Sequence, residues 1–201
     1  TWTGNRWVAG GEGTNTLAYS SNGTTWTAVG SIFTTTGRTA GWSNPTIGNP
    51  YIQQPTVAVG DGSAHTIAIS PDGVKWTGLG KTIFSTYGLG IGWNGSIWVA
   101  GGAGTNSLAY SYDGRTWTGL GTSIFTSCRN VAWNGTRWVA VGLGTNTLAY
   151  SSDGISWTGL GTSIFSAQGL GIAWNGTQWV AGGEGTSNSI ATSSDGITWT
   201  G

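Results

Sequence analysis

Short runs in which large and small residues alternate recur along the whole chain, separated by turn residues. Residues 137–142, 147–151 and 155–158 each have the length and alternation of a β-strand. Asn134-Gly135 and Asp153-Gly154 lie between such runs. These dipeptides favour two-residue hairpins, because a type I′ turn needs a positive φ at both central residues. The pattern therefore predicts short antiparallel strands joined by tight turns, essentially without helix.

This pattern occurs five times. Its first Trp is found at Trp2, Trp42, Trp93, Trp133 and Trp174. Four strands in about 40 residues are typical of a propeller blade. We therefore predict an all-β fold, a closed five-bladed β-propeller with four-stranded antiparallel blades. It forms one domain, residues 1–201, with repeats at 1–38, 39–89, 90–129, 130–170 and 171–201. An open solenoid is the alternative, but it requires polar capping units, and neither end shows one.

The alternation also predicts how the repeats pack. Leu170, Ile172 and Trp174 point to one face of their strand, and Gly171 and Ala173 point to the other. A face of large residues can then lie on the Gly/Ala face of the next repeat. The 14 Trp residues all occupy repeat positions, so we interpret a given Trp as a packing residue rather than as a ligand platform.

Charge and composition narrow the range of partners. Charged residues make up 7% of the chain and the net charge is zero. Because phosphate binding needs clustered Lys and Arg, we do not expect nucleic acid as a partner. No apolar run approaches the length of about 18 residues that a membrane span requires. The single Cys128 leaves the compartment open, with an extracellular or virion-surface location favoured.

The second hairpin of each repeat carries a family resemblance. The run Ser70-Pro71-Asp72-Gly73-Val74-Lys75-Trp76 resembles the Asp-box of sialidase-type propellers, with one residue fewer between Asp and Gly. The Asp-box is a structural hairpin, so the resemblance implies a fold and no chemistry. The whole chain resembles Trp- and Gly-rich repeat proteins of large DNA viruses and environmental sequences. In architecture it resembles tachylectin-2-type lectins, although no lectin motif matches residue by residue.

The sequence offers no catalytic constellation. Glycosidases need a pair of carboxylates, and the predicted inner strands contain no acid. His65 is the only histidine, so no nucleophile–base pair can be assigned. Glu12, Asp61 and Glu184 share one repeat position; a cation held by all three is an alternative, but nothing fixes a ligand geometry. We predict that the chain is not an enzyme and has no cofactor and no metal.

The repeated polar turn after the second strand is the candidate binding site. Uncharged amides and hydroxyls beside apolar side chains suit neutral sugars, and weak sites repeated around a ring act together on a multivalent glycan. The residues are Thr14, Asn15, Thr105, Asn106, Thr145, Asn146 and Asn188. We expect repeats 1, 3 and 4 to be competent, repeat 2 to be weak because His65 lies in its turn, and repeat 5 to be doubtful. The alternative is that these residues simply build the turn.

Three further features leave alternatives open. Arg38 and Arg129 occupy equivalent positions before the inner strand and either hold an anion or are solvated. The insertion from Ser43 to Pro55 either carries function or is a tolerated loop. The chain as a whole is either a lectin that binds neutral glycans or a non-catalytic structural or interaction module that binds protein surfaces.

Overall fold

The computed structural model describes residues 1–42 and 55–201, and every helix or strand in these ranges is a β-strand. The predicted insertion, except for Pro55, lies outside the described residues. The strands are β1 (Trp7–Gly10), β2 (Leu17–Ser20), β3 (Thr27–Gly30), β4 (Thr36–Gly41), β5 (Thr56–Asp61), β6 (Ile67–Ser70), β7 (Thr77–Gly78), β8 (Tyr87–Trp93), β9 (Trp98–Ala103), β10 (Leu108–Ser111), β11 (Thr118–Gly119), β12 (Ser127–Trp133), β13 (Trp138–Leu143), β14 (Leu148–Ser151), β15 (Thr158–Gly159), β16 (Gln168–Trp174), β17 (Trp179–Glu184) and β18 (Ile190–Ser193).

The strands pair in five antiparallel units that follow chain order. Units 2, 3 and 4 each have four strands, β4–β7, β8–β11 and β12–β15. Unit 1 (β1–β3) and unit 5 (β16–β18) have three strands. An isolated bridge adjoins each of them, Trp2 with Trp7 and Thr192 with Thr200. One pairing, between Ser127 and Ala103, joins units 3 and 4 into a continuous sheet of eight strands.

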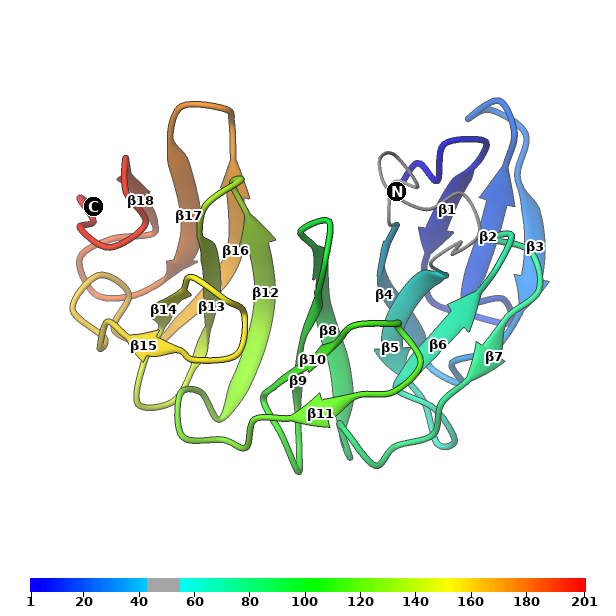
Figure 1. Cartoon of the computed structure of the whole chain (residues 1–201), viewed down its shortest axis with the longest axis horizontal. Coiled ribbons are helices and arrows are strands. Elements are labelled where there is room, and N and C mark those ends of the chain that lie inside the picture. Colours follow the sequence, from blue (N-terminus) through cyan, green and yellow to red (C-terminus); the bar gives the residue numbers. More distant parts are fainter. Residues whose placement is uncertain (43–54) are drawn as a thin grey trace.

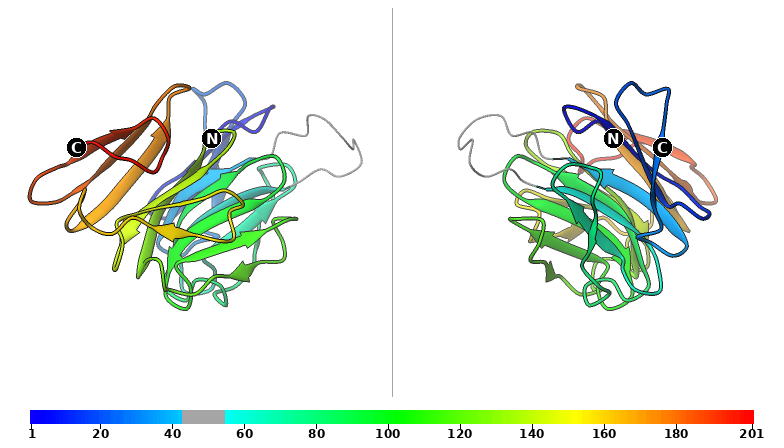
Figure 2. Two further views of the ribbon diagram at one scale, coloured as in Figure 1. Left: turned by 60° about the vertical axis from the view of Figure 1, so that its left-hand side comes forward. Right: turned by 90° about the vertical axis from the view of Figure 1, so that its right-hand side faces the viewer.

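The units follow one another around an open arc (Figure 1). Consecutive units contact each other in series, through β1 with β4, β4 with β8, β8 with β12 and β12 with β16. Unit 1 and unit 5 form the two ends of the arc (Figure 1), and the left view of Figure 2 shows unit 5 at one margin of the molecule. The prediction of an all-β, propeller-like array is thus confirmed. Within residues 1–42 and 55–201, a closed ring and a fourth strand in every unit are not found, because the arc is open and units 1 and 5 have three strands each.

The Asp-Gly hairpins form at the predicted positions, through one repeated hydrogen-bond pattern, but the prediction of two-residue loops is wrong. In unit 4 Tyr150 pairs with Thr158, so the fourth strand is Thr158–Gly159 rather than residues 155–158, and Trp133 pairs with Trp138 across Asn134-Gly135. The loops are longer because the Ser and Asp side chains hydrogen-bond the backbone inside them.

In unit 3 the Oγ of Ser111 accepts the N–H of Gly114 at 2.9 Å, and the Oδ1 of Asp113 accepts the N–H groups of Arg115 and Thr116, each at 2.7 Å. Gly114 has a φ of 69°, a conformation that glycine adopts without steric cost. Asn22 accepts the equivalent bonds in unit 1. The acids of these hairpins therefore have a structural role.

These hydrogen bonds predict a loss of stability in acid. The backbone N–H groups of Ile197 and Thr198 lower the pKa of Asp195 to about 2, whereas the pKa of an Asp in an unfolded chain is about 3.9. A carboxyl whose pKa is lower in the folded state stabilises the fold above its unfolded pKa, and this contribution is lost as the pH falls through the folded pKa. We expect the Tm to fall between about pH 4 and pH 2.

The matched variant is Asp195→Asn, because Asn22 builds the same turn in unit 1. Thermal unfolding followed by circular dichroism should show a smaller acid-dependent fall in Tm for this variant than for the wild type. An identical fall in both proteins would contradict the assignment.

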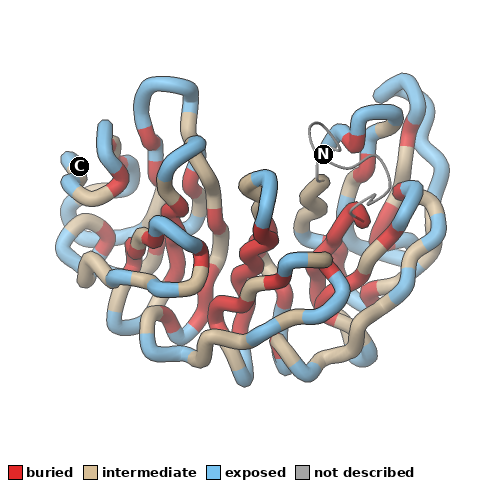
Figure 3. Tube along the Cα trace, viewed as in Figure 1, coloured by how far each residue is buried: buried red, intermediate tan, exposed pale blue. Residues whose placement is uncertain are grey.

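Buried residues follow the strands of the units (Figure 3), and the core clusters combine residues of consecutive units. At the three later boundaries the earlier unit contributes aliphatic side chains, and the later unit contributes a second-strand Trp and small residues. Between units 2 and 3, Val57 and Ile67 lie against Trp98 and Ala100. Trp98, Trp138 and Trp179 are fully buried. For these three the interpretation of Trp as a packing residue is confirmed.

Candidate functional site

Two equivalent pockets lie where the hairpin of one unit approaches the connection that leaves the preceding unit. We call them the inter-unit pockets. The pocket between units 2 and 3 has a volume of about 260 Å³ and is lined by Ile67, Leu79, Gly80, Thr82, Ile83, Arg115, Thr116 and Trp117. The pocket between units 3 and 4 has a volume of about 130 Å³ and is lined by Ser107, Leu108, Leu120, Gly121, Ser123, Ile124, Ile155 and Trp157. Their linings share seven repeat positions, and only Thr116 and Ser107 have no counterpart in the other pocket.

Each inter-unit pocket combines an aromatic ring, aliphatic walls and a hydroxyl group. The Nε1–H of Trp117 donates to the carbonyl oxygen of Gly114 at 2.9 Å, and that of Trp157 donates to Gly154 at 3.1 Å. This bond fixes the ring, which remains half-buried. Thr82 or Ser123 provides an exposed hydroxyl in the wall. An apolar ring face with a few placed polar groups is the usual composition of a small-ligand site.

The predicted Thr-Asn turns hold the walls of these pockets. The Oδ1 of Asn106 accepts the N–H of Gly121 at 2.9 Å, and its Nδ2 donates to the carbonyl oxygen of Ile83 at 2.8 Å. Ile83 lines one inter-unit pocket and Gly121 lines the other. The amide therefore links two connections, which supports the turn-building interpretation.

The same arrangement recurs in the later units. Asn146 accepts from Gly161 and donates to Ile124, both at 2.8 Å, and Asn188 donates to Ile164 at 3.2 Å. The other predicted residues of these turns are exposed, namely Thr14, Asn15, Thr105 and Thr145. Contact of any of these residues with a sugar stays a prediction.

His65 takes the place of the asparagine in unit 2. Its Nδ1 accepts the N–H of Gly80 at 3.0 Å, and Gly80 lines the inter-unit pocket between units 2 and 3. The imidazole thus provides the same acceptor as Asn106 does for Gly121. His65 was expected to weaken the site in repeat 2 by altering the turn. Because its side chain preserves the backbone contact, this argument does not apply to the wall of the pocket.

Loss of one linking amide should measurably destabilise the protein. Asn146→Ala removes two hydrogen bonds to partly buried backbone groups, so we expect the free energy of unfolding to fall by about 1–3 kcal/mol. Asn146→Asp keeps the acceptor for Gly161 but loses the donor to Ile124, and should cost less than the Ala variant. Urea denaturation of the two variants tests this order, and an unchanged midpoint for Asn146→Ala would contradict the linking role.

A separate central cavity lies along the first strands. It has a volume of about 370 Å³ and is lined by Arg38, Thr39, Leu89, Arg129, Asn130 and Leu170. The structure therefore brings Arg38 and Arg129 to one cavity, as their repeat positions suggested.

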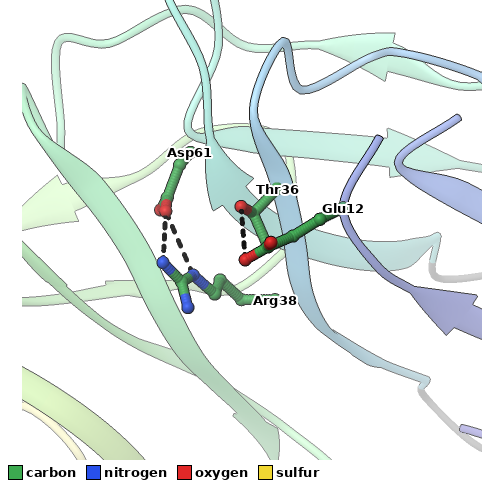
Figure 4. Close-up of polar contacts among 4 residues, drawn as sticks. All are labelled: Glu12, Thr36, Arg38 and Asp61. Atoms are coloured by element: carbon green, nitrogen blue, oxygen red, sulfur yellow. Dashed lines mark hydrogen bonds and ion pairs between the residues drawn. The ribbon is translucent and has the colours of Figure 1, made fainter. Parts of the chain in front are cut away.

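Each of these arginines already has a partner. Arg38 forms an ion pair with Asp61 at 2.6 Å (Figure 4), and this hydrogen-bonded carboxylate raises the pKa of the guanidinium. Arg129 donates to the Oε1 of Gln168 at 3.0 Å. The charge that Arg38 brings to an anion is thus offset by Asp61.

The three carboxylates that share a repeat position are not gathered into one site. Glu12 accepts the hydroxyl of Thr36 at 3.5 Å (Figure 4), Asp61 binds Arg38, and Glu184 accepts an amide N–H of Gln168 at 2.8 Å. Within residues 1–42 and 55–201 no group of three or more His, Cys, Asp or Glu side chains could hold a metal. Cys128 is buried, and burial raises the pKa of its thiol.

In the same two ranges the structure has no helix that is long and apolar enough to cross a membrane.

Comparison with known proteins identifies the fold class and no family. No protein-family model matches the sequence, and no curated protein matches it. Among solved structures, the computationally designed Ika8 protein is similar at a TM-score of 0.59 and 13% identity, over 96% of this chain and 57% of that one. YCF48 from Cyanidioschyzon merolae is similar at a TM-score of 0.51 and 13% identity, over 100% of this chain and 81% of that one. A GH74 xyloglucanase from Xanthomonas campestris has a TM-score of 0.48 and 14% identity, over 96% of this chain and 37% of that one.

The likeness to YCF48 supports a propeller-like, all-β repeat fold and leaves the activity open. The chain spans little more than half the length of the designed protein. Sequence reasoning missed the half-exposed ring of the hairpin Trp, because Trp117 and Trp157 were assigned to packing together with all other Trp residues. The signal was that this Trp always lies next to the Asp-Gly turn.

Proposed function

We propose that the chain binds neutral carbohydrates in the inter-unit pockets, without catalysing a reaction. The observation that carries this proposal is the repetition of one lining, an indole ring with aliphatic walls and a hydroxyl, at two successive boundaries. A sugar presents C–H groups on one ring face and hydroxyls at its edge, so it matches such a lining. The same residue types recur in the sequence at Trp76 and Trp199.

The charges of the linings favour a neutral ligand. The lining of the pocket between units 3 and 4 contains no charged residue, and that of the other pocket contains Arg115 alone. Each site is small and open, so a single sugar would bind weakly. Two sites in a fixed arrangement would act together on a polymer, because the second contact becomes intramolecular.

The five units also support a finer interpretation of the fold. Each unit carries the same strand order and the same hairpin bonds, and the bridges at Trp2 and Thr200 occupy the positions of the missing strands. We therefore interpret the five units as propeller blades, two of them with one strand reduced to a single bridge.

A glycan array tests the proposed function. The panel contains glucans, mannans, galactans and N-acetylglucosamine oligomers, with sialylated and sulfated glycans as charged controls. We expect binding to at least one neutral glycan, with a much larger loss for the double variant Trp117→Ala/Trp157→Ala than for either single variant. Tyr112→Ala is the matched control, because it removes an exposed aromatic of the same hairpin outside the pockets.

Two outcomes would contradict the proposal. One is full binding by the folded double variant, and the other is the absence of binding to any neutral glycan. Hydrolysis of a bound glycan, abolished by a single substitution, would contradict the non-catalytic part alone.

A second candidate function is a non-catalytic structural or interaction module. The observation that favours it is a group of exposed, large apolar side chains at both ends of the arc. In this function the ends bind another protein surface.

A further inference from the structure

The boundaries between units 2 and 3, 3 and 4, and 4 and 5 share one interface with two different sides. Unit 2 has Thr56 in place of the second-strand Trp, so the boundary between units 1 and 2 differs in this respect. The earlier unit presents its leading face, which consists of the Val after the second-strand Trp and the first aliphatic residue of the third strand. In unit 4 these residues are Val139 and Leu148. The later unit presents its trailing face, which carries the second-strand Trp and two Ala residues, in unit 5 Trp179, Ala181 and Ala191.

Within the two described ranges, no unit lies in front of the leading face of unit 5. Val180 is 38% exposed and Ile190 is 64% exposed, whereas the equivalent Val139 and Leu148 are 0% and 1% exposed. The backbone next to these two side chains also has free space on this face. A Cβ added to Gly182 would meet a single atom within 4 Å, at 3.9 Å, whereas one added to the equivalent Gly101 would lie 2.8 Å from the sulfur of Cys128.

Among the described residues, the trailing face of unit 1 is more exposed than the trailing faces of the later units. Trp7 is 42% exposed, whereas the equivalent Trp98, Trp138 and Trp179 are all 0% exposed. Trp2 and Trp26, on the same unit, are 42% and 44% exposed. Ala9 and Ala18 are partly exposed, although their counterparts in units 3 and 4 are buried.

From these two faces we infer that copies of this chain associate head to tail, with the trailing face of unit 1 of one copy covering the leading face of unit 5 of the next. The two faces lie at opposite ends of the arc (Figure 1), so another copy can cover each of them. The contact would continue an interface that the chain already builds three times.

The geometry also specifies which residues the contact buries. The first strand of unit 1 is represented only by the bridge at Trp2. The two faces would therefore contact each other mainly at the second to fourth strand positions. Val180 and Ile190 should therefore become buried, whereas Leu170 should not, because its repeat position faces the central cavity. A contact between different faces either closes a ring of copies or continues as a filament.

The test is the mass of the full chain in solution, measured by sedimentation velocity across a range of concentrations. We expect the mass to rise above the 20.6 kDa of one chain as the concentration rises. Ile190→Asp and Trp7→Arg should each weaken association by roughly ten- to hundred-fold, the effect of losing one buried large apolar side chain. Leu170→Arg is the control, since Arg38 and Arg129 occupy that repeat position in units 2 and 4.

A mixture of the two defective variants distinguishes this contact from a symmetric one. The Ile190→Asp protein keeps an intact trailing face and the Trp7→Arg protein keeps an intact leading face, so an equimolar mixture should form a one-to-one dimer. Trp26→Arg replaces Trp7→Arg if the latter fails to fold. The inference would be overturned by a wild-type chain that stays monomeric, even if that chain closes on itself and protects Ile190 from solvent. A mixture of the two variants that stays monomeric would overturn it as well.

Discussion

Trp138→Ala should lower the free energy of unfolding by about 3–5 kcal/mol, the usual range for deleting a large buried aromatic side chain. Trp138 is fully buried between units 3 and 4, where it packs with Val99, Leu108 and Ala149. Its ring also lies over Gly92, where an added Cβ would come within 2.7 Å of it. The lost contacts belong to two units at once, so we expect the boundary as a whole to weaken.

The matched control for this substitution is Trp7→Ala, at the same repeat position in unit 1. Trp7 is 42% exposed, so its removal should cost no more than about 1 kcal/mol in the isolated chain. Guanidinium denaturation at a low protein concentration, where copies do not associate, compares the two variants. Equal losses would show that the boundary between units 3 and 4 is not the main source of stability.

Gly90→Ala should destabilise the protein by forcing two neighbouring units apart. A Cβ at Gly90 would lie 2.8 Å from the Cα of Asn130 and 3.1 Å from the carbonyl oxygen of Arg129, both in the backbone of the next unit. Because neither atom can move away alone, units 3 and 4 must separate. We expect a loss of about 1–3 kcal/mol in the free energy of unfolding, typical of overpacking.

Gly171→Ala provides the internal control, because Gly171 has the same repeat position in unit 5. There an added Cβ would meet nothing within 4 Å. In a strand, Ala restricts the unfolded chain more than Gly does, so this variant should be neutral or slightly more stable. If calorimetry gives both variants the same Tm, the first strands of units 3 and 4 do not approach as closely as the structure shows.

The sequence did not predict the length of the hairpin loops, nor the bulge beside Leu170 that places this residue at the central cavity while Ile172 lies in the core. It was sufficient to predict most strands, the positions of the turns and the packing of the buried Trp side chains on small residues. Each of these features depends on neighbours in the chain, as in the Asp113-Gly114 turn, or on strict repetition, as at Trp98, Trp138 and Trp179. The curvature of the array was not predictable in this way. It depends on how closely each unit approaches the next, which is a property of contacts such as that between Gly90 and Asn130.

The candidate site was predictable only in part, for a similar reason. The partners of Asn106 are Ile83 and Gly121, which lie 23 and 15 residues away along the chain, so no local pattern shows that the amide is engaged. The pairing of Arg38 with Asp61 spans two strands, and the sequence had placed the two residues in separate candidate sites. Trp117 and Trp157 were recognised as repeat residues, but their partial exposure became visible only in the folded array.

The most direct test of the central claim observes the indole N–H groups themselves. The chain has 14 Trp residues, and each gives one indole signal in a proton–nitrogen correlation spectrum. On titration with glucan, mannan or N-acetylglucosamine oligomers, we expect the signals of Trp117 and Trp157 to shift, and that of the buried Trp138 to stay unchanged. Shifts confined to other indoles, or no shift with any of these sugars, would contradict carbohydrate binding in the inter-unit pockets.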